Sequence, residues 1–354
     1  MRKLFWLLVL LVAVAGYLHN IQGWDLKRAR TLPGVSAFWK DDSATTTPIG
    51  QRGVGTHWET ATAMPSARTN FGTAIVGDKI YVLGGHDGYL RTLDSVVVYD
   101  IATDTWSDVA PLPQAMHHPA VASDGKSVFV LGGMTGFASR PLDVAYAYDP
   151  IRNVWEEIGQ LNDFRGDAAA AFLKDRLYVL GGTTTAGSDS ALEFYDTERK
   201  NWNGLPAMPT ARHGHALVGL GETLYALGGR LGTTKDLAAV EAFSGGEWKT
   251  LPEMPVARSG FGAVVQEGKI LVVGGSSDVG LIASIDVFDP KKSLWSSLPV
   301  PAPHPRRGVG AVIYKNRVYV IGGGRAKWYS VSDLNEVLIL DPKGDAAIAA
   351  EKKK

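Results

Sequence analysis

One residue type recurs at a fixed place in this chain: an arginine stands sixteen residues before a Gly-Gly pair in five of six instances. The five are Arg68, Arg165, Arg212, Arg258 and Arg306. In the remaining instance the place is taken by Met116, which is followed by His117 and His118. Guanidinium groups donate paired hydrogen bonds to carboxylates and sulfates. If folding brings these side chains together, they form a binding site for an anion.

Two further arginines, Arg230 and Arg325, closely follow a Gly-Gly pair and join this candidate site. The nearby carboxylates are Asp87, Asp94 and Asp167, but no paired-carboxylate motif marks a general acid and base among them. The histidines lack Asp or Glu at a repeated ligand spacing, so the sequence predicts no metal site and no cofactor. The chain has no cysteine, which excludes disulfides, iron–sulfur clusters and a thiol nucleophile.

These positions belong to a repeat that fills most of the chain. Six apolar segments, such as IYVLGG and VYVIGG, end in Gly-Gly pairs that begin 48, 49, 47, 46 and 48 residues apart. The first glycines of the pairs are Gly84, Gly132, Gly181, Gly228, Gly274 and Gly322. Six units of this length need about 286 residues, which is the length of the segment 56–341. The array therefore contains six copies.

Each unit has the pattern of four short strands. A small-residue segment such as GTAIV precedes the Gly-Gly strand, and a later segment ends in an aromatic–acid pair such as Tyr99-Asp100. Six residues after the acid, four units have a tryptophan, as at Trp106. Such marks are typical of a propeller blade. We expect the glycines to permit close approach of the next blade, the aromatic residues to pack between blades, and the acid to accept hydrogen bonds from the following turn.

This pattern resembles the kelch-repeat family, whose motif joins a Gly-Gly pair to a tyrosine and a tryptophan at such spacings. The resemblance covers all six units and implies an all-β fold, a six-bladed β-propeller. The sixth unit lacks a tryptophan strand of its own. However, Trp58 precedes Arg68 by ten residues, the spacing between Trp202 and the arginine of the unit after it. We therefore expect residues 56–62 to form the outer strand of the last blade, so that an N-terminal strand closes the ring.

Propeller symmetry predicts where the recurring residues lie. The arginines stand at the entry to each innermost strand, so we expect them around one mouth of the central channel. The loops after the Gly-Gly pairs open on the same face, which makes this mouth basic. A structural alternative is that each arginine donates to carbonyls of the adjacent blade. The chain as a whole carries 36 basic and 36 acidic side chains, so nucleic acid is not an expected partner.

The segments outside the repeat have targeting features. Arg2 and Lys3 precede an uncharged apolar run over residues 4–18, which predicts a signal peptide or an N-terminal membrane anchor in residues 1–18. Residues 19–55 are expected to form a flexible linker, and 342–354 a polar tail. The propeller is therefore expected to be exported, to the periplasm or another extracytoplasmic space, either free or associated with the membrane.

Two functions follow from a basic mouth on an exported propeller. The first is a binding module for an anionic small molecule, an acidic glycan or a partner protein. The second is an enzyme acting on an acidic sugar, because the periplasmic sialate mutarotase is similar in fold and export. Binding is favoured, since the blades lack the long insertions that would enclose a pocket and since this fold hosts many grafted functions.

Overall fold

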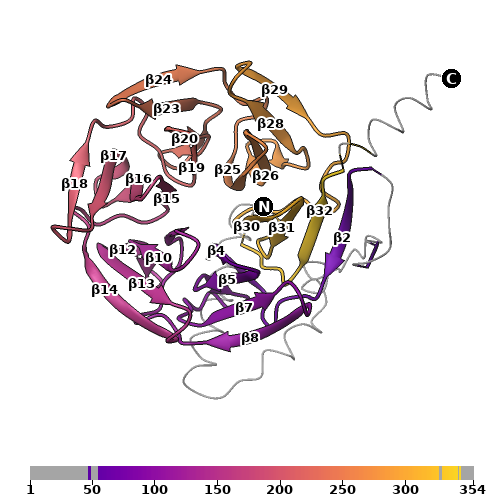
Figure 1. The fold of residues 1–354 in the computed structure, drawn as a ribbon, viewed down its shortest axis with the longest axis horizontal. Helices are drawn as coiled ribbons and strands as arrows, with labels where there is room; N and C mark the ends of the chain where they lie inside the picture. Colours follow the sequence, from indigo (N-terminus) through magenta and orange to yellow (C-terminus); the bar gives the residue numbers. More distant parts are fainter. Residues whose placement is uncertain (1–46, 49–54, 327–328, 342, 344–354) are drawn as a thin grey trace, which may run out of the picture. The chain divides into compact units, whose positions relative to one another are not determined.

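The computed structural model describes residues 47–48, 55–326, 329–341 and 343. Their strands form six antiparallel sheets arranged in a ring, a six-bladed β-propeller (Figure 1). The predicted all-β fold is therefore confirmed. The predicted signal or anchor segment 1–18 lies outside the described residues, as do most of the predicted linker and tail. Within the described part of the chain, no helix is long and apolar enough to cross a membrane.

Four main strands make up each blade and follow one another from the channel outward. Blade 1 consists of β4 (Gly72–Val76), β5 (Lys79–Leu83), β7 (Val96–Asp100) and β8 (Thr105–Val109). Blade 2 consists of β9 (Ala120–Ser123), β10 (Val128–Leu131), β13 (Val144–Asp149) and β14 (Val154–Gln160). Blade 3 consists of β15 (Ala169–Leu173), β16 (Arg176–Thr184), β17 (Gly187–Asp196) and β18 (Asn201–Leu205).

The other three blades repeat this order. Blade 4 consists of β19 (Ala216–Leu220), β20 (Thr223–Leu227), β23 (Val240–Ser244) and β24 (Glu247–Leu251). Blade 5 consists of β25 (Ser259–Gln266), β26 (Lys269–Ser277), β28 (Asp286–Asp289) and β29 (Leu294–Ser297). Blade 6 consists of β30 (Gly310–Tyr314), β31 (Arg317–Ile321), β32 (Asn335–Ile339) and β2 (His57–Ala61).

Short strands extend the loops on the face that carries the Gly-Gly pairs. They are β3 (Arg68–Thr69), β6 (His86–Asp87), β11 (Met134–Thr135), β12 (Arg140–Pro141), β21 (Arg230–Leu231), β22 (Lys235–Asp236) and β27 (Gly280–Leu281). In blades 1, 2 and 4 these strands form two-stranded ribbons, whereas β27 pairs with the end of β26.

The Gly-Gly pairs join neighbouring blades. The N–H of the second glycine donates to the backbone carbonyl at the arginine position of the next blade, as Gly133 does to Arg165 at 2.9 Å. The same bond connects all six pairs of neighbouring blades. The first glycine has a positive φ, and a Cβ added at Gly132 would lie 2.3 Å from the Arg165 carbonyl oxygen. Any side chain would therefore push the next blade away, as the sequence predicted.

The ring closes with a strand from the N-terminal side of the repeat. β2 pairs antiparallel with β32, and Trp58 lies opposite Leu338. The predicted closing strand is therefore confirmed. β1 (Thr47–Pro48) adds a two-residue parallel strand at the outer edge of β2. The last blade thus pairs two strands, β2 and β32, that are more than 270 residues apart in the chain, as the bond from Asn335 Nδ2 to the Thr62 carbonyl oxygen illustrates.

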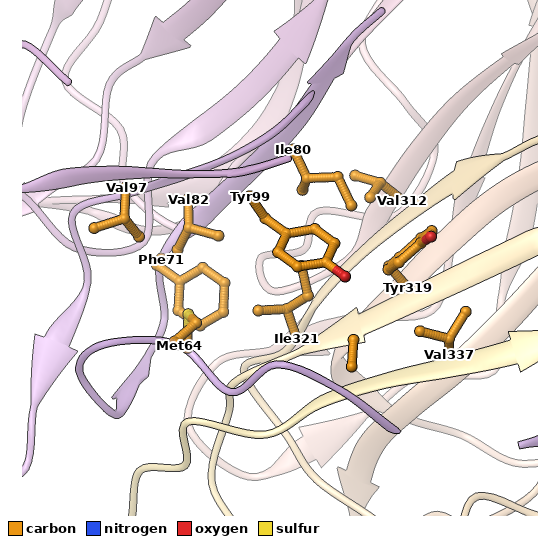
Figure 2. Close-up of a cluster of buried hydrophobic side chains, with 11 residues drawn as sticks. Met64, Phe71, Ile80, Val82, Val97, Tyr99, Val312, Tyr319, Ile321 and Val337 are labelled. Carbon is orange, nitrogen blue, oxygen red and sulfur yellow. The ribbon is translucent and has the colours of Figure 1, made fainter. Parts of the chain in front are cut away.

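A hydrophobic cluster fills the seam between blades 1 and 6. Figure 2 shows Ile80 and Val82 of β5 on one side and Tyr319 and Ile321 of β31 on the other. Ile80, Val82 and Ile321 are fully buried, and burying such a side chain contributes about 1.5–3 kcal/mol. Tyr99 of β7 crosses the seam, with its ring centroid 5.9 Å from that of Tyr319. Packing and strand pairing thus hold the closure together.

The recurring aromatic and acidic residues have structural roles. Tyr99 faces Trp106 across β7 and β8, with ring centroids 5.0 Å apart. Trp106 Nε1 donates to the Thr62 carbonyl oxygen in the connection that leads into the blade. Asp100 accepts a hydrogen bond from the N–H of Ala102 in the turn that follows it. These residues stabilise blades and turns, so function is left to the residues around the channel.

Candidate binding site in the central channel

The five recurring arginines are buried inside the blades, each at most 1% exposed. Each Nη1 donates to two backbone carbonyls of the arginine's own blade. One is on the first glycine of the Gly-Gly pair, and the other lies just before the third strand in four blades and within it, at Ala191, in blade 3. For Arg212 these acceptors are Gly228 at 3.0 Å and Ala239 at 2.9 Å. The other four arginines make the corresponding two bonds; they are Arg68, Arg165, Arg258 and Arg306.

Four of these arginines also pair with a carboxylate on the third strand of their blade. The pairs are Arg165–Glu193, Arg212–Glu241, Arg258–Asp286 and Arg306–Glu336. In each pair both side chains are at most 3% exposed. Removing one partner of such a pair leaves a buried charge without compensation, which typically costs about 3–5 kcal/mol. The pairs therefore stabilise the join between the second and third strands.

Blades 1 and 2 depart from this arrangement. Blade 2 has Met116 at the arginine position and Tyr146 at the acid position, and both pack in one hydrophobic cluster. Blade 1 keeps Arg68 but has Val97 at the acid position. Arg68 donates instead to the hydroxyl of Ser66, at 2.7 Å. Burial lowers the pKa of Arg68 to about 10, against the opposing effect of nearby carboxylates.

The arginines thus lie elsewhere than the sequence predicted. None of the five lines the channel cavity, and each guanidinium group is turned into its blade. The reason is local: two carbonyls and, in four blades, a carboxylate offer every arginine acceptors within its own sheet. The structural alternative correctly predicted that the arginines donate to backbone carbonyls. The acceptors, however, belong to the same blade and not to the adjacent one.

A different ring of residues surrounds the channel, two positions beyond the arginine position. Its members, which we call the channel ring, are Asn70, His118, Asp167, Gly214, Gly260 and Gly308. The N–H of each donates to the carbonyl of the preceding member at 2.7–3.2 Å, and Asn70 donates to Gly308, so six bonds form a closed circle. All six residues have a φ between 49° and 62°. Glycine adopts this conformation freely, and Asn, Asp and His do so more readily than other side chains.

The channel ring lies beside a cavity of about 370 Å³, which we call the channel basin. All six members of the ring line it. Polar side chains from neighbouring strands and connections also line it; they are Thr183, His213, His215, Arg230, Ser259 and Arg307. Ligand pockets typically have volumes of about 300–1,000 Å³, so the basin can hold a small molecule or one or two side chains of a partner.

An ion pair lies on one wall of the channel basin. His213 Nδ1 is 2.9 Å from Asp167 Oδ2, and His213 Nε2 is 3.0 Å from the Gly232 carbonyl oxygen. Both ring nitrogens face acceptors, and only the doubly protonated imidazole donates to both. Although burial opposes it, the bond to Asp167 raises the pKa of His213. Burial also disfavours the charge on Asp167, but the neighbouring histidines outweigh it and hold the pKa of this carboxyl well below its usual value.

Of the two predicted site histidines, only one lines the basin. His118 lines the basin, whereas His117 is 1% exposed and lies behind it. Their Nδ1 atoms are 2.7 Å apart, and the His117 ring stacks on His86 with centroids 3.9 Å apart. Burial, followed by the proximity of the other histidines, lowers the pKa of His117 to about 3 and that of His86 to about 4. This cluster is therefore uncharged at neutral pH.

Of the two other arginines predicted for the site, again only one lines the basin. Arg230 lines the basin and binds Asp236 with two hydrogen bonds, at 2.9 Å and 3.2 Å. Arg325 is half-buried and does not line the basin. Asp87 and Asp94 do not line it either, and Asp87 pairs with the guanidinium of a neighbouring loop residue at 2.6 Å.

Sequence reasoning missed Arg307 and Asn70, which both line the basin. Arg307 directly follows the buried Arg306, and Asn70 is two residues after Arg68, so counting on from the arginine position would have found both. Among the described residues, no group of three or more His, Cys, Asp or Glu side chains is arranged to hold a metal ion. The basin is thus an open site built from charges and hydrogen-bonding groups.

Two family models match the chain, each over slightly more than half of its length. One is described as the KLHDC2/KLHL20/DRC7 Kelch-repeats domain and matches residues 166–346. The other is described as the Attractin/LZTR1 beta-propeller and matches residues 56–239. Together they cover all six blades.

Curated relatives and a solved structure agree with these matches. Kelch-like protein 41 of Rattus norvegicus is 46% identical over 179 residues, which is 50% of this chain and 29% of that protein. Kelch-like protein 40 of Mus musculus is 34% identical over 174 residues, 49% of this chain and 28% of that protein. The alignments thus span less than a third of these relatives. The structure titled "Structure of YjhT" has a TM-score of 0.69 at 16% identity and covers 80% of this chain and 97% of its own, which shows a shared fold.

Proposed function

This protein belongs to the kelch-repeat β-propeller family, and we propose that it is a binding module whose channel basin holds an anionic group of its ligand. Propellers of this family generally serve in binding and interaction, and the fold alone does not identify the ligand. The ligand class must therefore be argued from the side chains that line the basin.

The balance of charge in the basin carries the proposal. Three of its lining side chains are cationic: Arg230, Arg307 and the protonated His213. One lining side chain, Asp167, is anionic, and His213 already pairs with it. Cationic side chains therefore outnumber anionic ones in the lining of the basin. A carboxylate or sulfate entering the basin would reduce this excess and accept charge-assisted hydrogen bonds.

The two arginines also influence one another through the basin. Burial lowers the pKa of Arg307, and the positive charge of Arg230 lowers it further, against the opposing charges of Asp167 and Asp236. Like charges that line one cavity repel each other, and an anion bound between them would be attracted to both. The site is therefore better suited to a negative group than to a neutral or a positive one.

We propose a protein segment or an acidic glycan as the partner that presents this group. The proposed location is outside the cytoplasmic membrane, supported by the basic start and apolar run of residues 1–18. Protease added to intact cells should reach an exported propeller once the outer barrier is opened, and full protection until the inner membrane is lysed would contradict export.

A sialate-type mutarotase or epimerase is the second candidate function. Asp167 favours it, because an ionised carboxylate at the cavity wall is able to accept a proton from a sugar hydroxyl. Its bond to His213 reduces that capacity, so binding remains the better-supported function. NMR of the anomeric exchange of sialic acid tests the alternative. Faster exchange with the wild type than with Asp167→Asn would favour the enzyme, and equal rates would exclude it.

The binding proposal is tested by Arg307→Gln, with Arg325→Gln as a matched control of the same type on the same face. We expect Arg307→Gln to weaken retention on an array of acidic glycans and acidic peptides by about 10- to 100-fold. This range corresponds to the loss of one charge-assisted hydrogen bond, about 1.5–3 kcal/mol. Arg325→Gln should retain the same array members as the wild type. Equal retention by all three proteins would contradict the proposal.

A further inference from the structure

The residue directly after each Gly-Gly pair differs from blade to blade. The six residues are His86, Met134, Thr183, Arg230, Ser276 and Gly324. Arg230 alone among them is an arginine or lysine, and it lines the channel basin. An arginine side chain that nothing holds samples many rotamers. The contacts that hold Arg230 therefore decide how its donors are presented to the basin.

The backbone of Arg230 is fixed on two sides. Its N–H donates to the His213 carbonyl oxygen at 2.8 Å, and its carbonyl oxygen accepts from the His213 N–H at 3.0 Å. In the blade 4 ribbon, β21 pairs antiparallel with β22, and Arg230 lies opposite Asp236. Side chains directly opposite in an antiparallel pair lie on the same face of it. The ribbon thus brings the carboxylate to the guanidinium.

Asp236 binds one edge of the guanidinium group. Nε donates to Oδ1 at 2.9 Å, and Nη2 donates to Oδ2 at 3.2 Å. The side chain of Asp236 is 2% exposed, whereas that of Arg230 is 26% exposed. Among the described residues, none accepts a hydrogen bond from Nη1 of Arg230. The acid is therefore behind the arginine, and the Nη1 donors are left for a ligand.

The carboxylate is itself held from the next blade. Ser259, the first residue of β25 in blade 5, donates its hydroxyl to Asp236 Oδ1 at 2.8 Å. Oδ1 thus accepts two hydrogen bonds, one from each of two blades, and a rotation of the carboxylate would break both. Asp236 is therefore a fixed acceptor, and a fixed acceptor restricts the rotamers of the arginine bound to it.

We propose that Asp236 is a positioning residue: it holds the guanidinium of Arg230 in the orientation that presents Nη1 to an anionic group in the channel basin. This inference rests on the proposed function and names the residue through which one of its cations acts. A guanidinium that is already oriented loses less side-chain freedom when the anion binds, so more of the interaction energy appears as affinity.

A positioning role and a purely electrostatic role predict opposite results for Asp236→Asn. If Asp236 only balances the charge of Arg230, the variant removes a negative charge near the basin and tightens the binding of an anion. If Asp236 positions Arg230, the variant should weaken binding by about 2- to 10-fold, which corresponds to the ordering of one long side chain. Asparagine keeps the size of the side chain, so the shape of the cavity is retained.

Two NMR measurements on the full chain test the proposal. Titration with D-glucuronate, a small carboxylate, gives a dissociation constant. The ¹⁵N order parameter of the Arg230 Nε–Hε bond reports how tightly the side chain is held, without any ligand. In Asp236→Asn we expect weaker binding of glucuronate and an order parameter that falls toward that of the exposed Arg140.

The matched control is Asp87→Asn. Asp87 also pairs with an arginine, Arg91, on a loop of the same face, and neither residue lines the basin. This variant should change neither the dissociation constant of glucuronate nor the order parameter of Arg230. A loss of binding equal to that of Asp236→Asn would mean that any lost ion pair on this face has the effect, which would contradict positioning.

A double variant shows whether Asp236 acts through Arg230. In the Arg230→Gln background, Asp236→Asn should not weaken the binding of glucuronate further, because the side chain that Asp236 holds is absent. Further weakening by the same factor would overturn the proposal. If Asp236→Asn does not fold, Ser259→Ala removes only the supporting bond to Asp236. It should lower the order parameter of Arg230, and an unchanged value would contradict the proposal.

The outcomes distinguish this inference from the proposed function. If Asp236→Asn leaves the order parameter of Arg230 unchanged, or binds glucuronate as tightly as the wild type or more tightly, positioning is wrong while the proposed function stands. If Arg307→Gln and Arg230→Gln both bind glucuronate as the wild type does, the proposed function fails and this inference fails with it. Failure of the wild type to bind glucuronate at millimolar concentration would count against both.

Discussion

Two rings of residues lie two positions apart in the sequence and differ in burial and in residue type. The arginine position is occupied by arginine in five of six blades, and those side chains are buried and bound within their own sheets. The channel ring contains four residue types, Asn, His, Asp and Gly, and borders an open basin. In a repeat protein, regularity thus marks the residues that every blade needs, and irregularity marks the residues that only one site needs.

Among the changes that test this difference between the rings, removal of one buried arginine should have the largest effect, a loss in the free energy of unfolding. Arg258→Ala leaves the carboxylate of Asp286, 2% exposed, without its cation. We expect a loss of about 3–5 kcal/mol in the free energy of unfolding, as measured by urea denaturation. The matched change Arg140→Ala, at an exposed arginine outside both rings, should cost less than about 0.5 kcal/mol. A loss below 1 kcal/mol for Arg258→Ala would contradict the bracing role.

A smaller effect is expected when both partners are exchanged together. Blade 2 combines Met116 with an apolar third-strand residue, Tyr146, in place of the ion pair. The double variant Arg258→Met with Asp286→Leu copies that apolar solution in blade 5. It should be more stable than the sum of its single variants predicts, by about 0.5–3 kcal/mol in a double-mutant cycle. Strict additivity would mean that the two side chains do not act as a pair.

The smallest effect expected is the contribution of one basin residue, His215, to the pH dependence of stability. The pKa of His215 is about 3 in the folded protein and about 6.5 when unfolded. Its neutral form is therefore favoured by folding, and this stability is complete above about pH 6.5 and is lost as pH falls toward 3. His215→Phe should flatten the decline in the urea midpoint between pH 6.5 and pH 4.5. Parallel declines in wild type and variant would contradict the assigned pKa.

Much of the fold follows from short-range regularities in the chain. The Gly-Gly spacing predicted six blades because glycine is required wherever a Cβ would meet the next blade, as at Gly132. Trp58 predicted the closing strand because its distance from Arg68 repeats a spacing found elsewhere. Both signals are local and recur in several units, so they can be read without coordinates.

The site was less predictable because side-chain direction depends on backbone conformation and on distant partners. The acids that hold the arginines come 28 to 30 residues later in the chain, as Glu193 does after Arg165 and Glu336 after Arg306. Nothing in the spacing of the arginines alone shows that these acids turn the side chains away from the channel. The left-handed residues two positions on, such as Asn70, border the channel instead.

Binding in the channel basin and bracing by the buried arginines are separated by one comparison: the melting temperature and the retention on the acidic array of Arg307→Gln, Arg258→Ala and the wild type. We expect Arg307→Gln to melt as the wild type does and to lose retention, whereas Arg258→Ala should melt at a lower temperature and, while folded, keep retention. The reverse pattern, with retention lost on changing Arg258 and kept on changing Arg307, would contradict this expectation.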